Sequence, residues 1–192
     1  NDIITDMQTQ LDRCRRSLAD FRAMVFSIKE QKVTAKNTKL LLDEIEDNIR
    51  VNYPEITLEL QQTLNQQKLQ KHAVVMADSA LLPAILNLVN NAVRAGKANN
   101  NQLLQITSQQ VDNNWQLIIR DFGRGFPLKK LAELGVKPVA SKQGLGMAVF
   151  LSHASLERLG GSLALTNHKD GGALVTLSLP ISGTKETAEL IQ

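Results

Sequence analysis

The chain has 192 residues, a net charge of +3, and 43% apolar and 21% charged residues. These values are typical of a globular protein and exclude a largely disordered chain, while the net charge is too small to indicate nucleic acid as a partner. The one cysteine, Cys14, excludes an internal disulfide framework, and no apolar run approaches the ~18 residues of a membrane span. We therefore expect any membrane anchor to lie in upstream segments outside this sequence.

Residues 1–28 carry two apolar series, each with a spacing of seven residues and offset from the other by three. Their members are Ile4, Leu11, Leu18 and Val25, and Met7, Cys14, Phe21 and Ile28. This pattern predicts a long helix with an a/d seam that pairs in a coiled coil or four-helix bundle, and so a homodimer; a helix packed on its own domain is the alternative. Residues 29–37 are polar and are interpreted as a linker.

After the linker, helical and alternating apolar patterns follow one another along the chain. Helices are predicted at 39–50, 80–95 and 145–159, the first capped by Thr38, the second capped by Asp78 or Ser79 and ended by Gly96. Strands are predicted at 56–60, 73–77, 103–108, 115–120, 162–166 and 173–179, the last two forming a hairpin. This order predicts an α+β fold with helices packed on one face of a mixed sheet.

The second predicted helix carries a stripe of polar side chains. Asn87, Asn91 and Arg94 are spaced i, i+4 and i+7, so they share one face of that helix. An amide oxygen is a hard ligand that suits Mg²⁺ when water and phosphate complete the shell. A surface stripe is the simpler interpretation of this feature taken alone.

Two glycine-containing segments come later in the chain. Asp121-Phe122-Gly123-Arg124-Gly125 follows an apolar strand and offers a carboxylate beside a backbone that a flat ligand can approach closely. Gly144-Leu145-Gly146 opens the third helix, whose first N–H groups favour phosphate oxygens. Each segment is a weak signal by itself.

The order and spacing of these three segments resemble the N, G1 and G2 boxes of the GHKL (Bergerat) ATP-binding superfamily, which has a two-layer α/β sandwich. Residues 38–181 are similar to the catalytic ATP-binding domain of sensor histidine kinases, and 1–28 to the second helix of their dimerisation domain, with 182–192 as a tail. The segments 10–15 and 156–161 resemble those of RegB/PrrB-type redox-responsive kinases.

The resemblance implies a role for each matching residue. Asn91 matches the Mg²⁺ ligand, Arg94 a basic position near the phosphates, and Asp121 the carboxylate that accepts from the adenine amino group. Gly123 and Gly125 match the turn beside the base, and residues 126–143 match the ATP lid. The G2 turn is matched by Gly144, Leu145 and Gly146. Asn87 stands where ATP-hydrolysing branches carry a glutamate, which favours phosphoryl transfer over hydrolysis.

Some positions depart from the family pattern. Lys142 stands where kinases often have glycine, and would either reach a phosphate or face solvent. Ala95 and Ala173 replace a frequent aromatic residue and a frequent threonine. The phosphoacceptor box is missing, because none of the histidines is followed by an acidic residue and then a proline; they are His72, His153 and His168.

The sequence thus predicts an ATP- and Mg²⁺-dependent protein-histidine kinase of a two-component system, whose acceptor histidine lies on an upstream helix and whose partner is a response regulator. It would be the cytoplasmic domain of an inner-membrane-anchored bacterial sensor. The alternatives are a serine kinase of the anti-sigma-factor type and a degenerate nucleotide-binding scaffold. Cys14, beside several arginines, is either a packed core residue or a redox switch.

Overall fold

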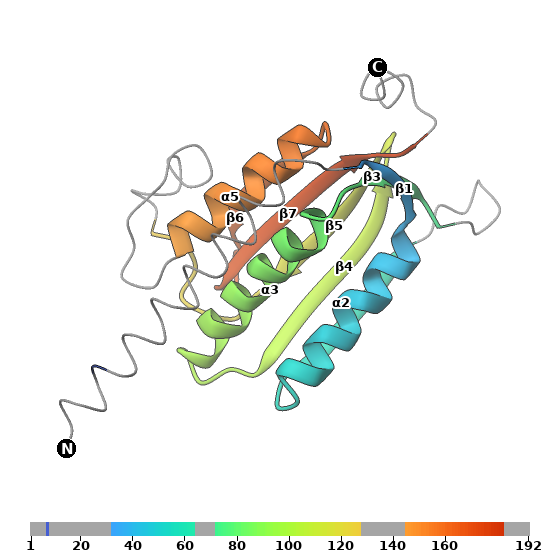
Figure 1. Cartoon of the computed structure of the whole chain (residues 1–192). Coiled ribbons are helices and arrows are strands. Elements are labelled where there is room, and N and C mark those ends of the chain that lie inside the picture. The colour runs from blue at the N-terminus through green and yellow to red at the C-terminus, as the bar shows by residue number, and fades with distance from the viewer. Residues whose placement is uncertain (1–6, 8–31, 64–71, 128–144, 183–192) are drawn as a thin grey trace.

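The computed structural model describes residues 32–63, 72–127 and 145–182, together with Met7. Its helices are α2 (Thr38–Asn52), α3 (Leu81–Lys97) and α5 (Leu145–Arg158). Its strands are β1 (Thr34–Asn37), β2 (Thr57–Thr63), β3 (Val74–Ala77), β4 (Leu103–Val111), β5 (Asn114–Arg120), β6 (Ser162–Asn167) and β7 (Ala173–Pro180). Figure 1 shows these elements coloured along the chain.

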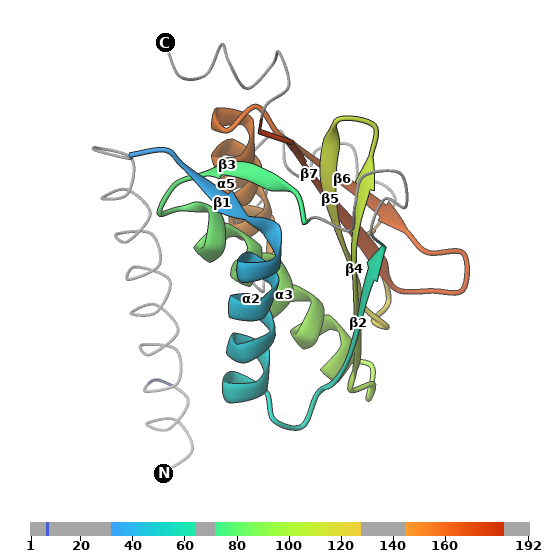
Figure 2. The same ribbon diagram turned by 90° about the vertical axis from the view of Figure 1, so that its right-hand side faces the viewer.

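The described elements form two layers, as the sequence predicts. One layer is a five-stranded sheet in the order β2-β4-β5-β7-β6, in which β2 is parallel to β4 and the other neighbours are antiparallel. Helices α2, α3 and α5 cover one face of this sheet (Figure 2). The predicted α+β class and the predicted β6–β7 hairpin are therefore confirmed.

The core lies between the helices and the sheet because the sequence periods of both layers place apolar side chains there. In β5, buried Trp115, Leu117 and Ile119 alternate with half-buried residues. The indole Nε1 of Trp115 donates to Ser108 Oγ at 2.9 Å, so this large side chain is buried without losing its hydrogen bond. Burying each large apolar side chain stabilises the fold by about 1.5–3 kcal/mol.

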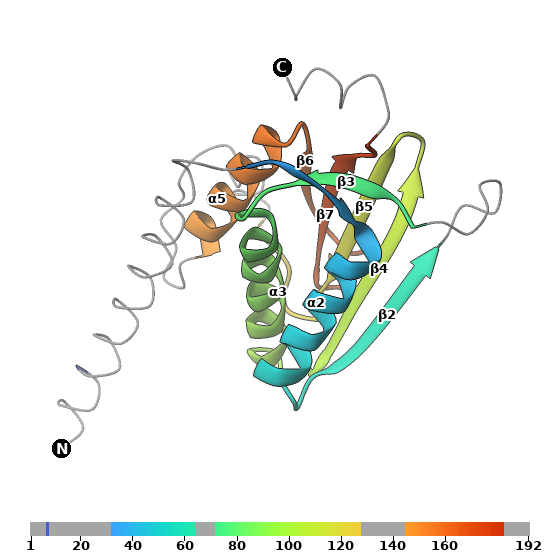
Figure 3. The ribbon, with the colours of Figure 1, turned by 45° about the vertical axis from the view of Figure 1, so that its right-hand side comes forward.

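Strand β1 corrects the prediction that the linker extends to residue 37. Thr34–Asn37 pairs antiparallel with β3, and the two strands form a small sheet at one end of the helical layer (Figure 3). The helix cap also differs from the prediction, because Asn37 Oδ1 accepts from Lys39 N at 2.8 Å. Thr38, the predicted cap, is instead a buried helical residue whose N–H donates to Ala73 O.

Asp78 accepts hydrogen bonds from the backbone just before helix α3 and from its first residue, while the N-cap position itself is Ala80 and not Asp78 or Ser79; the helix also continues past its predicted end. Asp78 Oδ1 accepts from the N–H groups of Ala80 and Leu81 at 2.8 and 3.2 Å. The helix runs through Gly96 to Lys97 instead of ending at Gly96, since Ala98 N still donates to Arg94 O at 3.0 Å.

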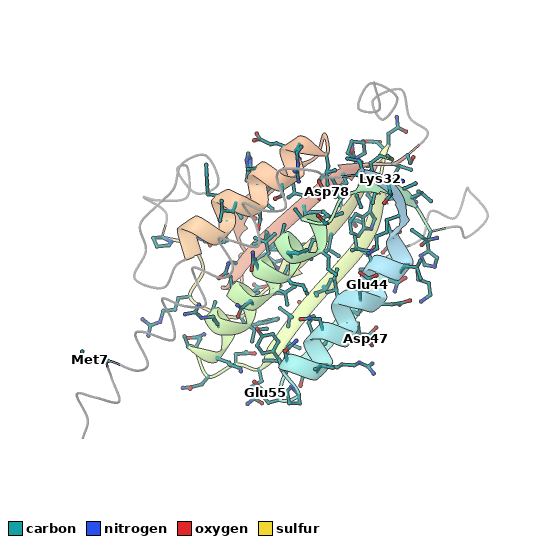
Figure 4. The ribbon with its side chains drawn as sticks, in the orientation of Figure 1. Met7, Lys32, Glu44, Asp47, Glu55 and Asp78 are labelled. Atoms are coloured by element: carbon teal, nitrogen blue, oxygen red, sulfur yellow. The ribbon has the colours of Figure 1, made fainter. Side chains whose placement is uncertain are left out.

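Asp78 also joins α3 to α5. Its Oδ2 lies 2.6 Å from Nη2 of Arg158, the last residue of α5, and the Asp78 side chain is fully buried. Figure 4 labels Asp78 just before the start of α3. Farther along the two helices, Ser152 Oγ donates to Ala84 O at 3.0 Å. These two contacts fix α3 and α5 beside each other.

Several predictions fall outside the described residues. They concern the 1–28 helix except Met7, residues 29–31 of the linker, residues 128–143 of the lid, the tail from 183 onward, and Cys14, Lys142 and Gly144. The division of the chain into a dimerisation helix, linker, catalytic domain and tail stays a prediction.

Candidate functional site

Asp121 stands at the end of β5, where the strand leaves the sheet. Its N–H donates to Ala173 O at 3.1 Å, which extends the pairing with β7 by one residue. Its Oδ1 accepts two backbone hydrogen bonds, from Gly123 N at 2.8 Å and Ala173 N at 3.0 Å. The residue is 6% exposed, so the local backbone holds this carboxylate in a fixed, buried position.

The two oxygens of Asp121 have different surroundings. Both backbone donors bind Oδ1, and none of the described groups donates to Oδ2. Burial raises the pKa of Asp121 above the ordinary carboxyl value. The hydrogen bonds from the two N–H groups lower this pKa, but their effect is smaller than that of burial. Oδ2, which has no donor among the described residues, is thus the atom with which Asp121 can accept a hydrogen bond from a ligand.

The two glycines of the segment meet different geometric demands. A Cβ on Gly123 would lie 2.8 Å from Ala95 O and 2.9 Å from Ala95 Cβ, so the chain passes α3 too closely for a side chain. Gly125 has a φ of +73°, and a Cβ there would also meet Asn167 Oδ1 at 2.6 Å. Both positions let the loop lie close against its neighbours.

The predicted asparagines lie on one face of helix α3, because they are four residues apart. Asn87 and Asn91 are both half-buried, one turn apart, and Arg94 is exposed toward the end of the helix. Asn91 Nδ2 is buried without a hydrogen-bond partner among the described residues. Asn90 instead points to α2, where its Oδ1 accepts from the Tyr53 hydroxyl at 3.0 Å.

These features surround one pocket with about 420 Å³ of space, part of it open to solvent. Asn91, Asp121 and Gly125 line it together, so residues from two of the three predicted segments meet there. The remaining lining residues are apolar: Leu88, Ala92, Ala95, Phe126, Val149, Ala173 and Val175. A mostly apolar pocket with a few polar groups is the usual form of a small-molecule site.

The third segment is described in part. Leu145 and Gly146 are the first residues of α5, and this helix reaches the pocket through Val149. Three predicted site residues do not line the pocket, although each is within two positions of a lining residue along the chain: Asn87, Arg94 and Gly123. Lys142 and Gly144 lie outside the described residues.

Sequence reasoning did not single out Phe126, Val149, Val175 or Asn167 as site residues. The first three are apolar residues whose patterns indicate only burial. Asn167 lies at the end of β6, and its contact with the loop after Gly125 appears only when the hairpin is placed in space.

The donor set of the pocket is compatible with a magnesium ion that arrives with a phosphate ligand. No group of three or more His, Cys, Asp or Glu that could hold a metal occurs among the described residues. Asn91 has an amide oxygen that could serve as one hard ligand, provided that phosphate and water supply the others. The residues therefore fit an ion shared with a ligand and not a metal site built by protein alone.

Comparison with known proteins identifies the class. Residues 77–183 match the family described as Histidine kinase-, DNA gyrase B-, and HSP90-like ATPase. This segment is more than half of the chain, and the chain belongs to that family. Among the described residues, no helix is both long and apolar enough for a membrane span.

Parts of individual sensor proteins are similar to this chain. The C4-dicarboxylate transport sensor protein DctB of Pseudomonas aeruginosa is 37% identical over 111 residues, which are 55% of this chain and 18% of that protein. The mycobacterial sensor histidine kinase MprB has a TM-score of 0.64 at 20% identity, over 78% of this chain and 98% of that chain.

Two further solved structures share the fold. The histidine kinase ThkA in complex with the response regulator TrrA has a TM-score of 0.67 at 17% identity, over 90% of this chain and 49% of that chain. The ATP-binding domain of PrrB from Mycobacterium tuberculosis has a TM-score of 0.61 at 21% identity, over 79% of this chain and 98% of that chain. The predicted resemblance to sensor histidine kinase catalytic domains is confirmed, and the resemblance to the RegB/PrrB type is consistent with these neighbours.

Proposed function

We propose that this domain binds Mg-ATP in the described pocket and transfers the γ-phosphoryl group to a histidine on an upstream helix, for relay to a response regulator. The observation that carries the proposal is the buried Asp121 carboxylate, whose Oδ2 has no described donor and which shares one apolar pocket with Asn91. Membership of the ATPase family supports the same ligand.

Asp121 would select adenine by hydrogen-bond direction. Adenine carries an amino group that donates where guanine carries a carbonyl that accepts. An ionised Oδ2 accepts a hydrogen bond from the adenine amino group and repels the guanine carbonyl oxygen. Apolar lining residues such as Leu88 and Val175 would contact the base and exclude water from this hydrogen bond.

The phosphates would lie near Asn91. Asn91 would supply an amide oxygen to Mg²⁺, which neutralises part of the phosphate charge when bound. Arg94, three residues further along α3, would add a positive charge near the phosphates. The first N–H groups of α5, at Leu145 and Gly146, would favour phosphate oxygens through the helix dipole.

Asn87 bears on the type of reaction. It lies one turn before Asn91 on α3, and a neutral amide is a poor general base. Water would therefore be activated weakly, so transfer to a protein side chain is favoured over hydrolysis.

The partner and the location are also part of the proposal. ThkA is found with the response regulator TrrA, which supports a response regulator as the partner of this chain. We propose that the protein forms a homodimer through residues 1–28. We also propose that this part of the protein is a cytoplasmic domain of a sensor anchored in the inner membrane. The redox role of Cys14 stays a prediction, tested by Cys14-dependent disulfide bands and by kinase activity under oxidising and reducing conditions.

Calorimetric titration of the chain with ATP, ADP and GTP, with and without Mg²⁺, tests the proposal. Asp121→Asn retains an oxygen for the bonds to Gly123 and Ala173 but places an amide donor at the Oδ2 position, so ATP affinity should fall about 10- to 150-fold. Asp112→Asn makes the same chemical change at an exposed turn and should leave affinity unchanged. Equal affinity for ATP and GTP, or none for either, contradicts the proposal.

Phosphoryl transfer needs its own experiment. A separate polypeptide carrying a histidine kinase acceptor helix is added with labelled ATP, and the label is expected on that polypeptide. Rapid release of inorganic phosphate without labelling would instead indicate a hydrolase.

A further inference from the structure

The segment that leads from Asp121 to Phe126 is fastened at both ends by the same hairpin. At its start, Asp121 exchanges hydrogen bonds with the backbone of Ala173, the first residue of β7. At its end, Phe126 N donates to Asn167 Oδ1 at 2.7 Å, and Asn167 Nδ2 donates to Phe126 O at 2.9 Å. Asn167 is the last residue of β6 and pairs with Ala173 across the ladder.

The Asn167 contact has the form of a backbone pairing made by a side chain. One carboxamide satisfies both the N–H and the C=O of Phe126, which needs a donor and an acceptor at a fixed separation. Phe126 is 7% exposed, so its backbone groups would otherwise be largely cut off from water. Asn167 thus fixes the backbone at the point where Gly125 takes its φ of +73°.

Fixing this backbone also fixes part of the pocket wall. Gly125 and Phe126 both line the pocket, and the Cβ that Gly125 lacks would overlap Asn167 Oδ1 at 2.6 Å. The amide therefore lies directly behind the wall and does not line the cavity itself. Its effect on a ligand would pass through the position of Gly125 and Phe126.

We propose that Asn167 is a positioning residue of the nucleotide pocket, which holds the Gly125-Phe126 wall in the ligand-binding arrangement before the ligand arrives. The inference rests on the proposed function, because it assigns the pocket to an adenine nucleotide. Without Asn167, part of the binding free energy would be spent on ordering the wall, and affinity would fall by the fraction of molecules in the competent arrangement.

The test compares the chain with Asn167→Ala and Asn167→Asp, with Asn113→Ala and Asn113→Asp at an exposed turn as matched controls. ADP affinity is measured by calorimetry, and hydrogen exchange of the Phe126 N–H by NMR. Asn167→Ala should weaken ADP binding about five- to thirtyfold, the range expected for the loss of one or two hydrogen bonds, and should speed exchange at Phe126 but not in β5. The Asn113 variants should change neither quantity.

Asn167→Asp adds a readout that general destabilisation would not produce. At neutral pH its carboxylate can accept from Phe126 N but repels Phe126 O, so ADP binding should weaken. Protonation restores a donor, so the deficit relative to the wild-type chain should shrink as the pH is lowered.

The outcomes separate the inference from the proposed function. Wild-type binding of ADP together with unchanged affinity in Asn167→Ala overturns the positioning role and leaves the nucleotide site in place. Equal acceleration of exchange in β5 and at Phe126 also overturns it, because the residue would then support the fold in general. A wild-type chain that binds no nucleotide overturns the proposed function, and with it the inference.

Discussion

Asn167 and Ala173 face each other across the β6–β7 ladder, and each holds one end of the Asp121–Phe126 segment. Asn167 does so with its side-chain amide, and Ala173 with its backbone N–H and C=O. The turn between them, residues 168–172, is closed by a hydrogen bond from His168 N to Gly172 O at 3.0 Å. The shape of the pocket wall therefore depends on a hairpin turn that does not itself line the pocket.

Two neighbouring glycines in this turn provide the first prediction. Gly171 and Gly172 both have positive φ, +89° and +84°, but a Cβ on Gly171 meets nothing within 4 Å, whereas one on Gly172 overlaps the Asp121 carbonyl. Gly171→Ala should lower the free energy of unfolding by about 1–2 kcal/mol through backbone strain alone. Gly172→Ala should lower it by a further 1–3 kcal/mol, roughly, and weaken ADP binding as well.

Urea unfolding and ADP titration of both variants check this prediction. If the two variants lose the same stability, the close approach of Gly172 to Asp121 is unimportant.

The ion pair between the buried Asp78 carboxylate and the exposed Arg158 gives the second prediction. Arg158→Met keeps an apolar stem but leaves the Asp78 carboxylate buried without its cation, so the free energy of unfolding should fall by about 2–4 kcal/mol. Asp78→Asn combined with Arg158→Met should recover part of the loss, because the amide oxygen still accepts from Ala80 and Leu81.

The exposed Glu46–Arg50 pair on α2 is the control for this experiment. Arg50→Met should change stability by less than about 0.5 kcal/mol, as is usual for a surface pair on one helix. Similar losses for Arg50→Met and Arg158→Met would show that burial of Asp78 adds nothing.

The elements that sequence predicts best are those with a strong apolar period. Helix α3 was predicted at 80–95 and spans Leu81–Lys97, because its buried residues recur with the helical repeat. Strand β1 was missed because its four residues, Thr-Ala-Lys-Asn, are exposed or half-buried and carry no apolar alternation. They form a strand because β3 offers backbone partners, which composition does not reveal.

In the candidate site too, residues in local motifs could be predicted and a contact between distant residues could not. Asn91, Asp121 and Gly125 were predicted from local motifs, and the structure brings them to one pocket. Asn167 is 41 residues from Phe126 along the chain, so its contact depends on how β6 and the loop after β5 come together. A polar side chain whose partner is a distant backbone leaves no local pattern to read.

Adjacent asparagines on α3 give the third prediction. Asn91→Ala removes a buried Nδ2 that has no partner among the described residues, so stability should change by less than about 1 kcal/mol. The enhancement of ATP affinity by Mg²⁺ should disappear, because the amide oxygen is gone.

Asn90→Ala should show the reverse behaviour. It removes the acceptor of the Tyr53 hydroxyl and should cost about 0.5–1.5 kcal/mol of stability while leaving the Mg²⁺ effect intact. Calorimetric titrations with and without Mg²⁺, with thermal unfolding of both variants, measure these effects. A persistent Mg²⁺ effect in Asn91→Ala would remove this residue from the proposed metal shell.

The last prediction concerns the pH dependence that burial imposes on Asp121. Because burial raises its folded-state pKa above the ordinary value of 3.8, the native chain takes up this proton at a higher pH than the unfolded chain does. The stability linked to this proton is therefore fully present below 3.8 and is lost as the pH rises through the folded-state pKa. Asp121→Asn has no such proton but retains an oxygen for Gly123 N and Ala173 N.

The free energy of unfolding of the wild-type chain should consequently rise relative to that of Asp121→Asn as the pH falls through the raised pKa. At neutral pH, where the wild-type carboxylate is charged and buried, the variant should be at least as stable. Urea unfolding of both chains across the acid range measures the difference, with Asp112→Asn as the control for the loss of one exposed carboxylate. A difference that stays constant with pH would mean that the two N–H groups balance the effect of burial on the pKa of Asp121. A difference that changes in the opposite direction would mean that they outweigh it.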